Sequence, residues 1–118
     1  MAEAKRSTRV AERLREELAV LVSRELSDPR VAGAIVSRVE MSDDLKTARV
    51  YVRRLEGVAG GEDATLVAGL TKAGSLLRRE VTKRVGLRYA PELRFFYDAG
   101  LDATNRIESL LEDIKRGK

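Results

Sequence analysis

The residues best suited to chemistry in this chain are seven cations concentrated in one stretch, residues 72–94. Set against the two glutamates of the same stretch, the seven cations give it a charge of +5, whereas the whole 118-residue chain carries only +4. A localised excess of cations is typical of a surface that binds a polyanion such as nucleic acid. A solvated helix face would give the same pattern, and charge alone leaves both interpretations open. The seven cations are Lys72, Arg78, Arg79, Lys83, Arg84, Arg88 and Arg94.

The inventory of side chains argues against catalysis. The sequence contains no histidine and no cysteine, so the commonest general base, the commonest metal ligand and any disulfide are absent. The adjacent carboxylates Asp43 and Asp44 lie in a predicted turn, and no Gly-x-x-x-x-Gly-Lys phosphate loop is present. We therefore predict a protein that is not an enzyme, with no catalytic residue, no metal, no cofactor and no small-molecule substrate.

Aromatic side chains offer a second route to nucleic acid, because bases stack on them. Tyr51, Phe95, Phe96 and Tyr97 are candidates, but aromatic residues make up only 4% of the chain. Leu93, Phe95 and Tyr97 alternate onto one side of a predicted strand, which favours a role in the hydrophobic core. The segment from Gly57 to Gly60 fits the Gly-x-x-G pattern of a phosphate clamp, yet it follows a strand, and we interpret it as a flexible loop.

The sequence shows no sign of membrane insertion or export. No apolar stretch approaches the roughly 18 residues of a membrane helix. The stretch from Met1 to Arg6 has no apolar run after its charges, unlike a signal peptide. We expect a cytoplasmic protein without a membrane partner.

The elements that position the cations follow from hydrophobic periodicity. Residues 8–26 have apolar side chains at helical spacing, with Ser7 or Thr8 as the N-cap and an end at Ser27-Asp28-Pro29. Two strands with period-two alternation follow, joined by a turn at residues 42–44. The inward-facing residues are predicted to be Ile35, Val39 and Met41 in the first strand, and Ala48, Val50 and Val52 in the second.

A long helix is predicted from Asp63 to Val85, because its apolar residues stay on one face until Gly86 ends it. Pro91 introduces a third strand over residues 93–97, and a short helix carries apolar residues over 107–114.

We expect one domain over residues 1–118, with flexible ends at about 1–6 and 115–118. The fold class is α+β, a three-stranded sheet with helices on one face. The other face is expected to be solvated and to carry Arg38, Glu40, Arg49, Tyr51 and Arg53.

The order of elements, together with particular residues, resembles the ribosome-binding factor A family from about Arg9 to Leu111. The motifs that carry the resemblance are Asp28-Pro29-Arg30-Val31, Ser42-x-Asp44-Leu45, Ala48-x-Val50-Tyr51-Val52, Pro91-Glu92-Leu93-x-Phe95 and Arg106-Ile107-x-x-Leu110-Leu111. The resemblance implies a variant of the type II KH fold, α-β-β-α(kink)α-β with a short C-terminal helix. It also implies a factor without chemical activity that binds the free small (30S) ribosomal subunit and its 16S rRNA late in maturation and supports growth in the cold.

Two other classes of function stay open on the residues alone. The first is a general RNA-binding or translation-regulating domain, and the second is a protein–protein interaction domain whose cations meet an acidic partner. We expect a monomer, because no long apolar face is left unpaired.

The family replaces the Gly-x-x-G loop of ordinary KH domains with a helix kink, which the resemblance implies at Ala73-Gly74-Ser75. The glycine lies one position earlier than in the family pattern. Glycine weakens a helix and serine can bend one. The unbroken apolar face, taken alone, favours a straight helix instead.

The predicted RNA-binding surface lies beyond this kink. Leu77, Val81 and Val85 face the core, which places Arg79 and Lys83 on the opposite, solvent side of the helix. The full set predicted to contact RNA is Lys72, Arg78, Arg79, Lys83, Arg84 and Arg88.

Overall fold

The computed structural model describes residues 5–54 and 64–98, and its elements follow the predicted order. They are α1 (Arg6–Glu25), the 3-10 turn η1 (Pro29–Val31), β1 (Ala34–Met41), β2 (Thr47–Arg54), α2 (Ala64–Lys72), α3 (Gly74–Val85) and β3 (Glu92–Tyr97). The α+β fold class is confirmed. The predicted loop at 57–61, the Gly-x-x-G match within it, the helix over 107–114 and the tail at 115–118 lie outside the described residues.

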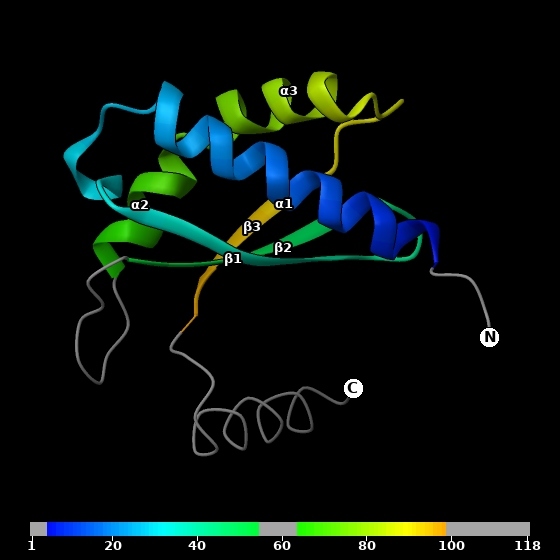
Figure 1. Cartoon of the computed structure of the whole chain (residues 1–118), viewed down its shortest axis with the longest axis horizontal. Coiled ribbons are helices and arrows are strands. Elements are labelled where there is room, and N and C mark those ends of the chain that lie inside the picture. The colour runs from blue at the N-terminus through cyan, green and yellow to red at the C-terminus, as the bar shows by residue number, and fades with distance from the viewer. Residues whose placement is uncertain (1–4, 55–63, 99–118) are drawn as a thin grey trace, which may run out of the picture.

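The three strands form one mixed sheet in the order β1-β2-β3. β1 and β2 pair antiparallel through the turn after Met41, whereas β3 runs parallel to β2. A parallel neighbour requires a crossover, and α2 and α3 provide it on the face that α1 also covers (Figure 1). All three helices of the described chain therefore lie on one side of the sheet.

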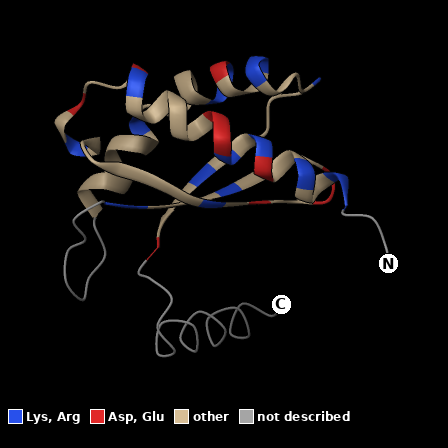
Figure 2. Ribbon diagram, viewed as in Figure 1, with Lys and Arg blue, Asp and Glu red and all other residues tan. Residues whose placement is uncertain are grey.

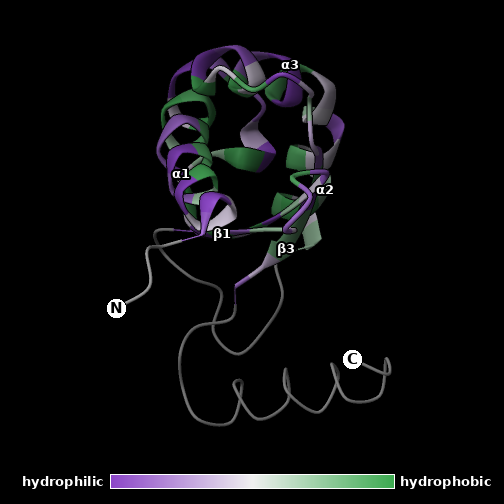
Figure 3. Ribbon diagram, turned by 90° about the vertical axis from the view of Figure 1, so that its right-hand side faces the viewer, coloured by the Kyte–Doolittle hydropathy of each residue, from purple (hydrophilic) through white to green (hydrophobic). Residues whose placement is uncertain are grey.

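The core fills the space between the helix layer and the sheet. Viewed end-on, hydrophobic stretches of the helices and strands border this space (Figure 3). Leu14 and Leu18 of α1 and Leu77 of α3 have no solvent-exposed surface. Completely burying a leucine side chain stabilises the fold by about 1.5–3 kcal/mol, so this layer anchors α1 and α3 to the sheet. The predicted core residues Ala48, Val50, Val52, Leu66, Leu70 and Val81 are also completely buried.

The predicted N-cap of α1 was wrong. The helix begins at Arg6 after Lys5, whose carbonyl accepts a hydrogen bond from Arg9 N at 3.2 Å. Ser7 therefore lies inside the first turn, where it is buried and its hydroxyl donates to Asp43 at 3.3 Å. The serine connects α1 to the β1–β2 turn instead of capping the helix.

A β-bulge changes which residues of β1 face the core. The register shifts between Val36 and Arg38, so Ser37 is an extra residue with no direct partner on β2. Val36, and not the predicted Ile35, is buried in the core, whereas Val39 and Met41 pack against it as predicted. Ser37 is held by its hydroxyl, which donates to the Tyr51 carbonyl at 3.0 Å and contacts Asp98 at 2.6 Å.

The long helix is interrupted where the resemblance placed a kink. α2 ends at Lys72 and α3 begins at Gly74, with Ala73 between them at φ −83° and ψ 4°. Backbone hydrogen bonds continue on both sides of the break, from Ala73 N to Gly69 O at 3.2 Å and from Leu77 N to Ala73 O at 3.0 Å. α2 and α3 run in different directions (Figure 1), which excludes the straight-helix alternative. α3 ends as predicted at Gly86, whose φ of 81° is left-handed.

The aromatic residues of β3 divide between the two faces of the sheet. Phe95 is buried in the core and Leu93 and Tyr97 pack against it, as predicted. Phe96 points to the other face and is 39% exposed.

Candidate nucleic-acid interface

The outer surface of α3 presents two of the predicted RNA-binding cations. Leu77 and Val81 bury one face of the helix, and Arg79 and Lys83 project from the opposite face with side chains 66% and 68% exposed. Glu80 lies 3.5 Å from Arg79 and 3.6 Å from Lys83, so one carboxylate is shared by two cations. Exposed ion pairs of this kind are weak, and both cations stay accessible to a phosphate.

Arg84 projects from the flank of α3 toward α1. Its guanidinium lies 3.5 Å from Glu17, and its carbonyl accepts a hydrogen bond from Arg13 at 3.4 Å. Arg84 therefore helps to hold α1 and α3 together, and its side chain is only partly exposed to solvent.

Arg78 projects from the other flank of α3, toward the connection to β3. Its guanidinium donates to the Ala90 carbonyl at 2.8 Å. This hydrogen bond ties α3 to the segment that joins it to β3 and that contains Arg88. Arg78 and Arg88 therefore lie close together and line one groove.

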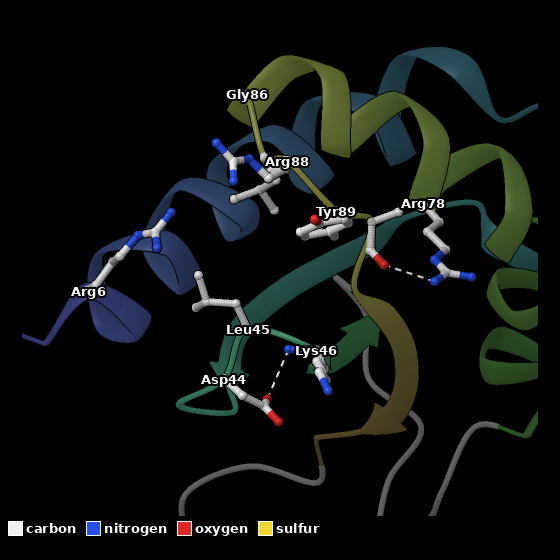
Figure 4. Close-up of a pocket in the computed structure, with 10 residues that line it drawn as sticks. Arg6, Asp44, Leu45, Lys46, Arg78, Gly86, Arg88 and Tyr89 are labelled. Carbon is white, nitrogen blue, oxygen red and sulfur yellow. Dashed lines mark hydrogen bonds between the residues drawn. The ribbon is translucent and has the colours of Figure 1, made fainter.

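This open groove has a volume of about 900 Å³. It is bordered by the start of α1, the β1–β2 turn and the α3–β3 connection (Figure 4). Two predicted cations, Arg78 and Arg88, line it together with Arg6 and Lys46, which the sequence analysis did not assign to the site. Four cations from three parts of the chain thus surround one concave surface, and Asp44 is the one acidic residue among the lining residues.

Asp44 offsets one of these four positive charges, and its carboxylate is engaged inside the turn. Its Oδ1 accepts hydrogen bonds from the Ser42 hydroxyl at 2.7 Å and from Lys46 N at 3.0 Å. These hydrogen bonds lower the pKa of Asp44, which keeps it ionised and fixes the turn. The fixed turn places Lys46 at the groove, where Tyr89 exposes 76% of its surface.

Lys72 is separate from the other predicted cations. It ends α2 before the helix break and lies close enough to Asp28 to help lower the pKa of that carboxylate. Of the six predicted residues, the structure groups Arg79 with Lys83 and Arg78 with Arg88, directs Arg84 to α1 and leaves Lys72 near η1. Arg6 and Lys46 were missed because no local pattern connects them to α3, and only the fold brings them together.

Among the described residues, no group of three or more His, Cys, Asp or Glu side chains is placed to hold a metal ion. Within the same part of the chain, no helix is both long and apolar enough to cross a bilayer.

Comparison with known proteins shows the family. The model of the family described as ribosome-binding factor A matches residues 6–111. The chain belongs to the ribosome-binding factor A family. Members of this family are non-enzymatic factors of ribosome assembly. The ribosome-binding factor A of Sorangium cellulosum is 56% identical over 117 residues, covering 96% of this chain and 91% of the relative. That of Desulfatibacillum aliphaticivorans is 40% identical over 111 residues, covering 92% and 87%.

Solved structures of ribosome-binding factor A share the fold. The crystal structure of the Thermus thermophilus protein aligns with a TM-score of 0.65 at 26% identity, covering 77% of this chain and 94% of that one. A solution structure of a Thermotoga maritima protein aligns with a TM-score of 0.68 at 33% identity, covering 87% and 96%. The α-β-β-α-α-β order is therefore the type II KH variant that the resemblance implied.

Proposed function

We propose that this chain binds the small (30S) ribosomal subunit and its 16S rRNA during late maturation, as a non-enzymatic assembly factor of the cytoplasm that supports growth in the cold. A homology model of the Thermus thermophilus ribosome-binding factor A has been fitted into a cryo-EM map of a 30S complex, and it aligns with this chain at a TM-score of 0.62 and 27% identity, covering 76% of this chain and 92% of the model. The observation that carries the proposal is the position of Arg79 and Lys83, which project from α3 directly opposite its buried face.

The geometry suits recognition of the RNA backbone. Arg79 and Lys83 lie four residues apart on one helix, which spaces their charges by about 6 Å along the helix axis. The groove beside them adds Arg6, Lys46 and Arg88 on a concave surface. Cations on a rigid scaffold neutralise phosphates and fix the orientation of the protein, with little reading of the base sequence.

The test is a charge reversal on α3 in the full chain. The double variant Arg79→Glu, Lys83→Glu should remain folded, because both side chains are exposed and surface substitutions shift stability by less than about 0.5 kcal/mol each. Its affinity for isolated 30S subunits, measured by co-sedimentation, should fall at least roughly tenfold. The slope of log affinity against log salt should flatten by about 0.9 for each lost contact to a duplex phosphate.

A matched control separates a specific surface from general attraction. The control compares two single variants, Lys83→Glu on α3 and Arg24→Glu on the last turn of α1. Both change the net charge by the same amount. If both single variants weaken binding equally, only net charge matters and the α3 surface is not the site. Binding to all RNA without preference for 30S subunits would point to a general RNA-binding domain, and absence from ribosomal fractions would point to a protein partner.

A further inference from the structure

The face of the sheet opposite the helices carries an ordered set of arginine and aromatic side chains. Across the three strands, Arg38 pairs with Tyr51, and Tyr51 pairs with Phe96. In the adjacent row Glu40 pairs with Arg49, and Arg49 pairs with Arg94. Figure 2 shows basic residues on the strands as well as on the helix layer. The two rows lie side by side on one face because they are two positions apart on β2 and on β3.

The first row is a column of stacked flat groups. The rings of Tyr51 and Phe96 have centroids 5.6 Å apart and planes 30° apart. The guanidinium of Arg38 lies 4.1 Å from the centroid of the Tyr51 ring. β2 is the central strand, so Arg38 and Phe96 flank Tyr51 from its two neighbours. The column ends at Phe96, which is 39% exposed and lies on β3, an edge strand of the described sheet.

The second row places two arginines directly opposite each other, an arrangement that lowers the stability of the sheet. Arg49 and Arg94 are direct partners on neighbouring strands, and like charges opposite each other destabilise a sheet. Glu40 lies 3.8 Å from Arg49, and Glu92 lies 3.2 Å from Arg94, which offsets part of the repulsion. Arg38 and Arg53 add two further positive charges on this side of the described sheet.

We propose that this face binds single-stranded RNA, with an unpaired base stacked on Phe96 at the end of the column and the adjoining phosphates held by Arg49 and Arg94. Bases of any sequence stack on aromatic rings, and arginine adds both charge and a planar partner for stacking. A phosphate placed between Arg49 and Arg94 would also relieve their mutual repulsion. An acidic peptide would match the arginines but would leave the stacked rings without a role.

This surface is distinct from the α3 surface, because the sheet lies between them. α3 meets phosphates without needing an exposed base, whereas the Phe96 end of the column requires one. The inference rests on the proposed function only in taking RNA as the ligand. It adds that the same molecule holds an unpaired segment on its opposite side.

The experiment compares two short RNA probes on the full chain. One is a single-stranded oligonucleotide of about eight nucleotides, and the other is the same oligonucleotide with abasic sites, which keeps the phosphates and removes the stacking. The unaltered protein should bind the complete RNA roughly tenfold more tightly than the abasic RNA, as expected for one stacked base.

Two matched double variants test the aromatic column. Tyr51→Leu, Phe96→Leu keeps apolar side chains but removes both rings, and it should bind the two probes equally. Tyr51→Phe, Phe96→Tyr keeps both rings and should retain the preference. An undiminished preference for complete RNA in the leucine variant would overturn the inference. So would a leucine variant that loses thermal stability with unchanged RNA binding, because the face would then be covered by protein.

A third variant keeps the inference testable if the leucine variant does not fold. Arg49→Gln, Arg94→Gln leaves the rings in place, and it should weaken binding of both probes by the same factor. Unchanged binding would contradict the assigned role of these arginines.

The outcomes for the two surfaces are independent. Arg79→Glu, Lys83→Glu should weaken 30S binding and leave the preference for complete over abasic RNA unchanged. If that variant loses 30S binding while the leucine variant behaves like the unaltered protein, the proposed function stands and this inference fails. If the unaltered protein prefers complete RNA but does not bind 30S subunits, this inference stands and the proposed function fails.

Discussion

The backbone of Gly69 approaches Val31 so closely that a β-carbon at position 69 would lie 2.9 Å from Val31 Cγ1. The same β-carbon would lie 3.0 Å from Arg30 Cβ. Val31 is buried, and its short branched side chain has little freedom to move away. The glycine therefore lets α2 rest directly on η1, even though glycine inside a helix costs about 1 kcal/mol relative to alanine.

This contact predicts that Gly69→Ala destabilises the protein although alanine is the better helix former. Overpacking a tight contact typically costs about 1–3 kcal/mol, which exceeds the gain in helix propensity. The measurement is the urea midpoint of unfolding, which should fall. A midpoint that rises would mean that α2 can shift away from η1 at no cost.

Gly74→Ala is the matched control and should have the opposite effect. A β-carbon at Gly74 would meet nothing within 4 Å, and the residue begins α3 without a left-handed backbone. The substitution should raise stability by up to about 1 kcal/mol, because alanine has the higher helix propensity. A large loss of stability at this position would show that the break at Ala73 depends on the glycine.

Hydrophobic periodicity could predict the elements in which the apolar residues stay on one face over the whole length. The alternation of Ala48, Val50 and Val52 fixed the inner face of β2, and the helical repeat from Leu66 to Val81 fixed the buried side of α2 and α3. Non-local contacts could not be predicted in this way. The bulge at Ser37 depends on hydrogen bonds to distant residues, and the approach of Gly69 to Val31 depends on the packing of α2 on η1.

The same reasoning explains what was found of the candidate site. Exposure of Arg79 and Lys83 follows from the helical repeat alone, so the sequence placed them correctly. The groove joins Arg6 and Lys46 to Arg88 across three parts of the chain, and no local pattern encodes that meeting.

Replacing Leu77 with Asp should unfold the protein. Leu77 is completely buried in the core, and a carboxylate there would lose its hydration without gaining a partner. An unpaired charge in the core costs several kcal/mol, a large fraction of the stability of a small domain. Circular dichroism and thermal melting provide the measurement. A folded variant with unchanged melting behaviour would contradict the assigned packing of α3.

The Asp28–Arg30 pair predicts a specific dependence of stability on acid. Asp28 accepts hydrogen bonds from the Arg30 side chain, the shortest at 2.7 Å, and from Arg30 N at 2.8 Å. These contacts lower the pKa of Asp28 from its usual 3.8 to about 2. A carboxylate whose pKa is lower in the folded state stabilises the fold above the unfolded pKa. That stability is lost as the pH falls from about 4 to about 2.

Asp28→Asn removes the titrating group and should flatten this part of the profile. The melting temperature of the variant should fall less steeply than that of the unaltered protein between pH 4 and pH 2. Glu25→Gln is the control, since it neutralises an exposed acid at the end of α1 and should leave the steep segment in place. Parallel profiles for the unaltered protein and Asp28→Asn would show that the pair contributes no acid sensitivity.

The groove predicts a role in 30S binding for a residue far from α3 in sequence. Arg6 lies on the first turn of α1 and lines the groove with Arg78 and Arg88. Arg6→Glu should preserve the fold, because an acidic residue suits the positive end of the helix dipole at its N-terminus. It should weaken binding to isolated 30S subunits several-fold and flatten the salt dependence by about 0.9 in log–log slope, the value for one lost phosphate contact. Arg24→Glu makes the same change of charge near the opposite end of α1, a helix of 20 residues and therefore about 30 Å long, and should have a smaller effect. If Arg6→Glu binds with unchanged affinity and unchanged salt slope while Arg79→Glu, Lys83→Glu does not, the RNA contact is confined to the outer side of α3 and the groove is not part of it.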